Sequence, residues 1–181
     1  ETYKKANIGI RNGKIVTITK KNINGNKEID ASNKIVSPGF IDFFSHVDGN
    51  PYSAECIARQ GGTTTIGGGR EFDGSILKKI AEEGFLINQG FFISHSFTLR
   101  TAAGIDSLYR PATQKEIQTM MSLAESFLEY GAFGIHFGLE FFPGTSKKEI
   151  ISLSRVCKKY DRVALVHLRK DGREGLNYFG E

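Results

Sequence analysis

Apolar and polar residues alternate in short runs over the first 37 residues of the chain. The stretch ANIGIRNGKIVTI, residues 6–18, has apolar residues on both sides of Asn12-Gly13. Asn-Gly between two such runs is a strong signal for a two-residue hairpin turn. A second stretch, KEIDASNKIVSP at residues 27–38, predicts two more short strands. Because no long helical pattern occurs here, we expect residues 1–37 to form part of a small β-domain.

From residue 38 onward, short apolar runs alternate with stretches of helical period. Runs typical of strands lie at residues 39–45, 61–69, 88–96, 132–138 and 162–169. Helical patterns lie at residues 53–60, 75–84, 113–130 and from residue 146 onward. Strands that alternate with helices in this way predict an α/β fold with a parallel sheet.

The two clearest helices carry capping signals at their N-termini. Thr113 is followed three residues later by Glu116, and Ser146 and Glu149 repeat this spacing. In such a capping box, each side chain bonds to a backbone N–H group that the first helical turn leaves free. Gly131 is a typical stop for the first of these helices. The sequence therefore predicts where both helices begin and where the first one ends.

The number of strands fits part of a barrel. A (β/α)8 barrel typically needs ~250 residues, whereas this chain has 181 residues and about five predicted strands. We expect the first half of a (β/α) barrel at residues 38–181, preceded at residues 1–37 by part of a small β-sandwich. An open doubly wound sheet is the alternative, but it would usually carry a phosphate-binding glycine fingerprint after its first strand. The stretch SHVDGNPYS found there does not match one.

Composition narrows the class of protein. The formal charge of +4 comes largely from lysines in scattered pairs, which are typical of a solvated surface, so we expect no nucleic-acid partner. Cys56 and Cys157 lie inside helical patterns and match neither a zinc motif nor a disulfide framework, so a reducing, cytoplasmic location is expected. No apolar run approaches the ~20 residues of a membrane span, and no signal peptide is visible, so we expect no membrane partner.

Polar residues gather directly after the predicted strands. His46 follows the first strand, Glu140 follows the fourth, and His167 ends the fifth. In a (β/α) barrel the loops after the strands form the active-site face. Imidazole and carboxylate groups bind zinc, and a bound metal lowers the pKa of water to about 7. These three residues are therefore candidate ligands of a divalent metal, with a buried, hydrogen-bonded histidine as the alternative for either imidazole.

Several stretches, taken together, resemble a known family. IGIRNGKIVTI and IDASNKIVSPGFIDFFSH look like the opening of the amidohydrolase superfamily. ARQGGTTTIGGG, SHSFTLRTAAG, GAFGIHFGLEFFPGT and VALVHLRKDG follow in the order seen in its D-aminoacylase branch, the N-acyl-D-amino-acid deacylases. The resemblance implies a small β-sandwich with a metal-containing (β/α)8 barrel. It also implies hydrolysis of a small-molecule N-acyl amino acid with one or two divalent metals, commonly zinc.

The resemblance implies roles for individual residues. His46 matches the second histidine of the family's strand-one pair, and His167 matches the strand-five histidine ligand. Glu140 matches a carboxylate near the metal centre. His95 and Arg169 match positions in the wall of the pocket and are expected to lie near the substrate.

The sequence departs from the family pattern around the expected metal. Phe44 replaces the first histidine of the strand-one pair and cannot bind a metal. Arg70 or Glu71 stands where many relatives carry a bridging cysteine, and only Glu71 has a donor oxygen. Asp48, two residues after His46, is a candidate to orient that imidazole, with an exposed loop aspartate as the alternative.

As an enzyme, the chain is expected to be incomplete. The family's strand-six histidine and its proton-shuttling strand-eight aspartate would lie beyond Glu181, so we expect no hydrolysis by this chain alone. Two other functions stay open: a non-catalytic relative that has lost metal ligands, and a dihydroorotase- or hydantoinase-like cyclic amidase. The latter usually has a lysine after strand four, which GIHFGLEF lacks. The expected partner is the remaining half of the barrel, or a second copy, covering the open edge of the sheet.

Overall fold

The chain forms two compact units, Glu1–Pro38 and Gly39–Glu181. The computed structural model describes residues 5–68, 74–170 and 172–175. In that described part, no helix is long and apolar enough to span a membrane.

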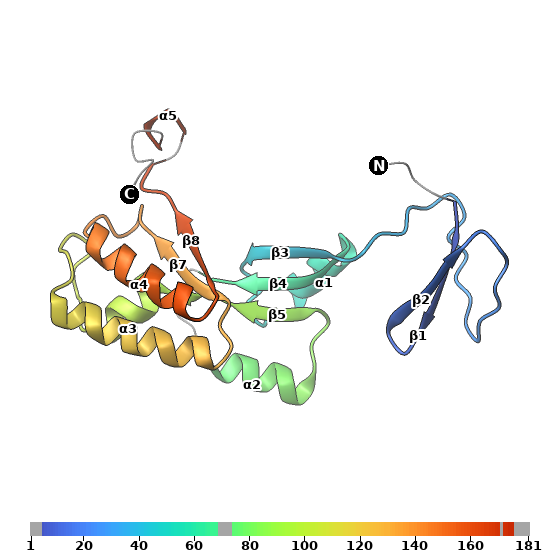
Figure 1. Cartoon of the computed structure of the whole chain (residues 1–181), viewed down its shortest axis with the longest axis horizontal. Coiled ribbons are helices and arrows are strands. Elements are labelled where there is room, and N and C mark those ends of the chain that lie inside the picture. Colours follow the sequence, from blue (N-terminus) through green and yellow to red (C-terminus); the bar gives the residue numbers. More distant parts are fainter. Residues whose placement is uncertain (1–4, 69–73, 171, 176–181) are drawn as a thin grey trace. The chain divides into compact units, whose positions relative to one another are not determined.

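The first unit is built around one antiparallel hairpin (Figure 1). β1 (Asn7–Arg11) pairs with β2 (Lys14–Thr19), and Asn12 and Gly13 form the turn with φ angles of 51° and 72°. Two consecutive positive φ angles are what a type I′ hairpin turn requires. The predicted hairpin is confirmed.

The two strands predicted at residues 27–38 are absent from this fully described segment, and that prediction was wrong. The segment contains a turn in which Lys34 N donates to Ala31 O over 3.0 Å. Ile29 and Ile35 remain 81% and 72% exposed. Apolar alternation reflects β propensity, whereas a strand also needs a neighbour to pair its backbone groups, and none of the described strands pairs with this segment. The assignment of residues 1–37 to a β-sandwich stays a prediction.

Strands and helices alternate in the second unit, and its paired strands are all parallel. The strands are β3 (Phe40–Ser45), β4 (Gly62–Gly67), β5 (Asn88–Phe91), β6 (Ile93–Ser94), β7 (Gly134–Gly138) and β8 (Val163–His167). The helices are α1 (Pro51–Arg59), α2 (Gly74–Glu83), α3 (Gln114–Glu129), α4 (Lys147–Lys159) and the short α5 (Gly172–Gly175). The predicted α/β class with parallel strands is therefore confirmed.

A break at Phe92 divides the sheet of the second unit into two parts. β3, β4 and β5 pair in that order, and so do β6, β7 and β8. Backbone bonds still join the parts: Phe92 N donates to Gly67 O over 2.7 Å, and Phe133 N donates to Phe91 O over 2.9 Å. The single strand predicted at residues 88–96 is thus two short strands, which together occupy one place between β4 and β7.

A π-helix, η1 (His95–Arg100), follows β6 directly and replaces the predicted end of that strand. Ser94 begins it by accepting a hydrogen bond at its side-chain oxygen from Phe97 N, over 3.1 Å. Helices α3 and α4 pack against each other (Figure 1). The π-helix η1 contacts α3 and β7, and α4 contacts both β7 and β8. These elements enclose the main core, whose largest members include Ile93, Leu99, Ile117, Met120, Ile135, Phe137 and Leu153.

Both predicted capping boxes are confirmed. Thr113 accepts from Glu116 N over 3.3 Å at the start of α3, and Ser146 accepts from Glu149 N over 3.2 Å at the start of α4. Each box satisfies backbone donors that a helix N-terminus cannot pair internally. The loop that leaves β7 at Gly138 ends where α4 begins at Lys147, so the cap of α4 also fixes the end of this loop.

Candidate functional site

The carboxyl ends of β3, β7 and β8 contribute to one open cavity of about 250 Å³. The residues that line it are Phe44, His136, Leu165, Val166 and His167. β7 and β8 are parallel, with Gly138 opposite His167, so their ends lie at the same edge of the sheet. The edge where the sequence predicted the active-site loops is therefore where two histidines meet a cavity.

Glu140 and His167, which the sequence predicted to converge, are in contact. His167 Nε2 lies 2.8 Å from Glu140 Oε2, and Leu139 N donates to His167 O over 3.1 Å. Both side chains are partly exposed. An ionised carboxylate can only accept a hydrogen bond, so the proton belongs on Nε2 of His167. The other ring nitrogen, Nδ1, then carries the lone pair.

His46 and Asp48 form a second, looser imidazole–carboxylate pair. His46 Nδ1 and Asp48 Oδ2 are 3.8 Å apart, which is an ion-pair distance and too long for a hydrogen bond. The turn after β3 brings them together: Asp48 and Gly49 have φ angles of 44° and 74°. Gly49 N donates to Gln89 Oε1 over 3.2 Å, which ties this turn to β5.

Phe44 contacts two imidazole rings. Its ring centroid lies 4.9 Å from that of His136 and 5.4 Å from that of His46. The sequence reasoning did not select His136, which occupies the middle of β7. Burial lowers the pKa of His136 to about 4, with smaller electrostatic contributions from the neighbouring histidines His167, His46 and His95. A histidine inside the apolar run GIHFG was the only available signal, and it is equally typical of a core residue.

The donor types fit a zinc-like metal, although the described residues do not make a complete binding group. Among them, no three His, Cys, Asp or Glu side chains converge closely enough to hold a metal ion. His46 and His167 each have a carboxylate nearby, which is the usual arrangement around a metal-binding imidazole. Arg70 and Glu71, considered for the bridging position, lie outside the described residues.

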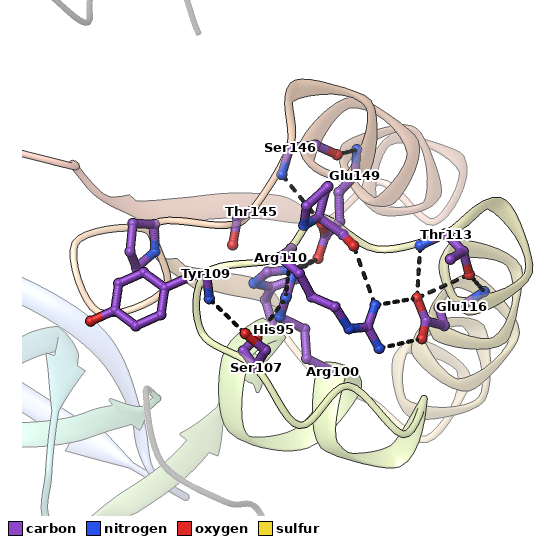
Figure 2. A network of polar contacts seen from close by, with 12 residues as sticks. His95, Arg100, Ser107, Tyr109, Arg110, Thr113, Glu116, Thr145, Ser146 and Glu149 are labelled. Atoms are coloured by element: carbon purple, nitrogen blue, oxygen red, sulfur yellow. Dashed lines mark hydrogen bonds and ion pairs between the residues drawn. The ribbon is translucent and has the colours of Figure 1, made fainter.

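His95 lies inside the protein in a buried ionic group (Figure 2). Its Nε2 is 2.9 Å from Glu149 Oε1, and Arg100 Nη1 donates to the same oxygen over 2.6 Å. His95, Arg100 and Glu149 are all 1% exposed or less. These contacts join η1 to α4, and the expected place of His95 near a substrate stays a prediction.

Arg169 binds the loop between β7 and α4. Its Nη1 donates to Pro143 O over 3.0 Å, and its Nη2 donates to Thr145 O. The guanidinium therefore connects the segment after β8 to the loop that carries Glu140. The substrate-proximal role expected for Arg169 stays a prediction.

Two curated proteins are similar to the chain over most of its length. The D-aminoacylase of Alcaligenes xylosoxydans xylosoxydans is 27% identical over 203 residues, which cover 93% of this chain and 41% of the relative. The N-acyl-D-glutamate deacylase of the same organism is 25% identical over 201 residues, with the same coverage of 93% and 41%. The chain thus spans about two fifths of the length of these relatives. No family model matches it.

Solved structures give the same result at the level of the fold. A D-aminoacylase variant in complex with copper chloride has a TM-score of 0.80 and 27% identity, covering 95% of this chain and 44% of that one. The N-acyl-D-glutamate deacylase from Bordetella bronchiseptica, complexed with zinc and a phosphonate inhibitor, has a TM-score of 0.79 and 26% identity. It covers 97% of this chain and 44% of its own.

The parallel α/β fold, with imidazole–carboxylate pairs at its strand ends, is similar to that of solved amidohydrolases. The sequence and the fold are both similar to those of the D-aminoacylase branch, and the resemblance predicted from the motifs is confirmed.

Proposed function

We propose that the protein is a metal-dependent amidohydrolase that cleaves the amide bond of an N-acyl-D-amino acid or a similar small molecule. The substrate class comes from the names of the relatives, D-aminoacylase and N-acyl-D-glutamate deacylase. The observation that carries the proposal is the contact between Glu140 and His167 at the carboxyl ends of neighbouring parallel strands. Barrel enzymes build their active sites at this edge.

His46 and His167 would hold the metal, zinc by preference. Glu140 accepts from Nε2 of His167, which leaves Nδ1 of that ring as the atom that would bind a divalent cation. In this arrangement Glu140 fixes the tautomer of His167 rather than binding the metal itself, whereas Asp48, 3.8 Å from His46 Nδ1, would have to move closer to orient His46 in the same way. A metal bound there would act as a Lewis acid on a water molecule and on an amide carbonyl.

The cavity beside these groups suits the acyl part of such a substrate. Phe44, Leu165 and Val166 give it apolar walls, while His136 and His167 give it two polar ring edges. Burial keeps His136 neutral, with a pKa lowered to about 4, so it adds no positive charge to the cavity at neutral pH. A neutral, mainly apolar wall favours an uncharged acyl group over a second carboxylate.

Residues 38–181 are, on this proposal, the first half of a (β/α)8 barrel. The strand places run in chain order and in parallel, as consecutive barrel strands do. β3 and β8, the outer strands of the described part, expose apolar side chains such as Phe40, Phe43 and Val163. The remaining half of the barrel, or a second copy of the chain, would cover them.

Hydrolysis of paired N-acetyl-D- and N-acetyl-L-amino acids by the full-length protein tests this function. We expect the D-compounds to be hydrolysed, activity to be lost in His167→Ala, and activity to fall about 10- to 100-fold in Glu140→Gln. Glu125→Gln is the matched control, because Glu125 also has one partner, Lys159, but lies away from the strand ends on α3. Full activity in His167→Ala, or no hydrolysis of any N-acyl compound, would contradict the proposal.

A non-catalytic relative is the second candidate, and Phe44 is the observation that favours it. The phenyl ring occupies a position where the family pattern has a histidine ligand, and it packs directly on His136 and His46. Phe44→His separates the two candidates. A lost site should gain metal affinity when this ligand is restored, whereas a site that works with Phe44 already binds metal without it.

A further inference from the structure

The ionic group formed by His95, Arg100 and Glu149 is fully enclosed between η1 and α4 (Figure 2). Arg100 comes from the last turn of η1, and its Nη2 also donates to two backbone carbonyls, those of Ser107 and Arg110, over 3.2 Å and 2.7 Å. Glu149 lies in the first turn of α4. One buried carboxylate therefore joins two elements that are far apart in the sequence.

The protonation states of Glu149 and His95 follow from their burial and from their contacts with each other and with Arg100. Burial alone would raise the pKa of Glu149, but hydrogen bonds from His95 and Arg100, together with the charge of Arg100, outweigh it and leave that pKa below its usual value. Burial lowers the pKa of His95 despite the nearby carboxylate. Glu149 is thus ionised and His95 neutral, so His95 donates from Nε2 to Glu149.

Glu149 also holds the end of the loop that carries Glu140. Its Oε2 accepts from Ser146 N over 3.3 Å, while Ser146 Oγ accepts from Glu149 N over 3.2 Å. The residues just before Ser146 are held from the other side by Arg169, which donates to the carbonyls of Pro143 and Thr145. The end of the loop from β7 to α4 is therefore held by these two sets of bonds, and also by Gly144 N, which donates to Leu108 O over 2.8 Å.

We propose that Glu149 is a positioning residue: by fixing the start of α4, it keeps the loop in the conformation that holds Glu140 against His167. The inference rests on the proposed function in one respect, that the Glu140–His167 pair belongs to the reactive site. Glu149 itself is buried and touches no cavity residue among its hydrogen-bond partners.

A similar motif elsewhere in the chain separates positioning from simple helix capping. Thr113 and Glu116 form the same capping box at α3, and Arg110 donates to Glu116 over 2.7 Å and 2.9 Å. Glu116 is partly exposed, and α3 follows a different loop from the one that carries Glu140. Variants of this box should lower stability without changing the Glu140–His167 contact.

The experiment reads the protonated nitrogen of His167 directly, by two-bond ¹H–¹⁵N NMR correlation on the metal-free, full-length protein. The parent should give the Nε2–H tautomer, and Glu140→Ala, which removes the acceptor, should define the signal of the lost contact. In Ser146→Ala and in Glu149→Gln we expect the NMR signal of His167 to shift toward that of the lost contact. The equilibrium ratio of bonded to separated Glu140–His167 pairs should fall about tenfold, as expected for the loss of one net hydrogen bond. Thr113→Ala and Glu116→Gln should leave the signal of His167 unchanged, and Ser146→Thr should retain the parent signal.

Glu149→Gln leaves Arg100 without its buried counter-ion, so that variant could fail to fold. The double variant Arg100→Met/Glu149→Gln removes both charges, and Ser146→Ala removes only the capping hydroxyl. If both Glu149 variants unfold, the His167 signal of Ser146→Ala alone tests the proposal. An unchanged His167 signal in Ser146→Ala and in any folded Glu149 variant would overturn the proposal, as would equal shifts in the Thr113 and Glu116 variants. Because no metal or substrate is present, this result is independent of whether the protein is a deacylase.

Discussion

Phe44 packs against His136, a buried histidine in the middle of β7. The two rings are 4.9 Å apart, and His136 is 5% exposed. A phenyl ring cannot hydrogen-bond to imidazole nitrogen in its plane or stabilise its charge as a carboxylate would. Burial is the main reason that the pKa of His136 falls to about 4, with smaller electrostatic contributions from His167, His46 and His95.

This shift makes stability depend on pH in a defined window. The pKa of His136 is about 4 in the folded state and 6.5 for an ordinary histidine, so the unfolded chain binds more protons between these values. The contribution of neutral His136 to the free energy of unfolding is complete above pH 6.5 and is lost as the pH falls toward 4. Over this pH range, we expect the free energy of unfolding of the parent to fall by up to about 3 kcal/mol more than that of His136→Gln.

Urea unfolding at pH 7, 5.5 and 4.5, in the presence of a chelator, measures this difference. His46→Gln is the control, because the side chain of His46 is 49% exposed. Parallel pH profiles for the parent and His136→Gln would contradict the assigned surroundings of His136.

At the residue scale, the sequence predicted some site residues and missed another for physical reasons. Glu140 and His167 could be paired in advance, because parallel strands bring their carboxyl ends to one edge. His136 could not, because its place in an apolar run is equally typical of the core. The burial of His95 depends on Arg100 and Glu149, which reach it from η1 and α4 and leave no local pattern.

Among the elements, the pairing of β7 with β8 depends on a close approach at Gly134. Its backbone lies so near Val163 that a Cβ atom would collide with the Val163 carbonyl. Gly138 lies at the other end of β7, where a Cβ would make only ordinary contacts, the shortest of 3.4 Å to Phe141. The strand that carries His136 can therefore accept a side chain at one end and not at the other.

Gly134→Ala should destabilise the protein by about 3 kcal/mol, because the backbone of β7 must move away from β8. Gly138→Ala should have a much smaller effect on stability. Thermal and denaturant unfolding of both variants measures the difference, and equal losses would show that the β7–β8 approach is not as tight as described.

Local signals predicted the elements that depend on local interactions. The capping boxes of α3 and α4 and the Asn12-Gly13 turn need only residues within a few positions of each other. The break at Phe92 depends on a bond to Gly67 in another strand, and η1 depends on partners in α4. Propensity carries no information about such contacts, so the third strand was predicted without its interruption.

At the scale of the whole chain, the apolar surface of the outer strands should cause association. In the described part of the second unit, Phe40, Ile41 and Phe43 on β3 are 60–64% exposed, and Val163 on β8 is 57% exposed. Unpaired strand edges with apolar side chains favour pairing with another chain. The α/β class could be predicted from the alternation of elements, whereas what covers these strands is not encoded in any local pattern.

Sedimentation velocity of the 181-residue chain over a hundredfold range of concentration should reveal oligomers that grow with concentration. Phe43→Lys should shift the distribution toward monomer. Tyr52→Lys, which changes a residue of α1 that is 79% exposed, should not. A monomer at every concentration would contradict an interface on β3.

The central claim is that His167, held by Glu140, belongs to a metal site. Elemental analysis of the purified protein, alongside His167→Ala and the control Glu125→Gln, tests it most directly. We predict near-stoichiometric zinc in the parent and in the control, and its loss in His167→Ala. A parent that contains no metal after purification with zinc present, or zinc that persists in His167→Ala, would contradict the account.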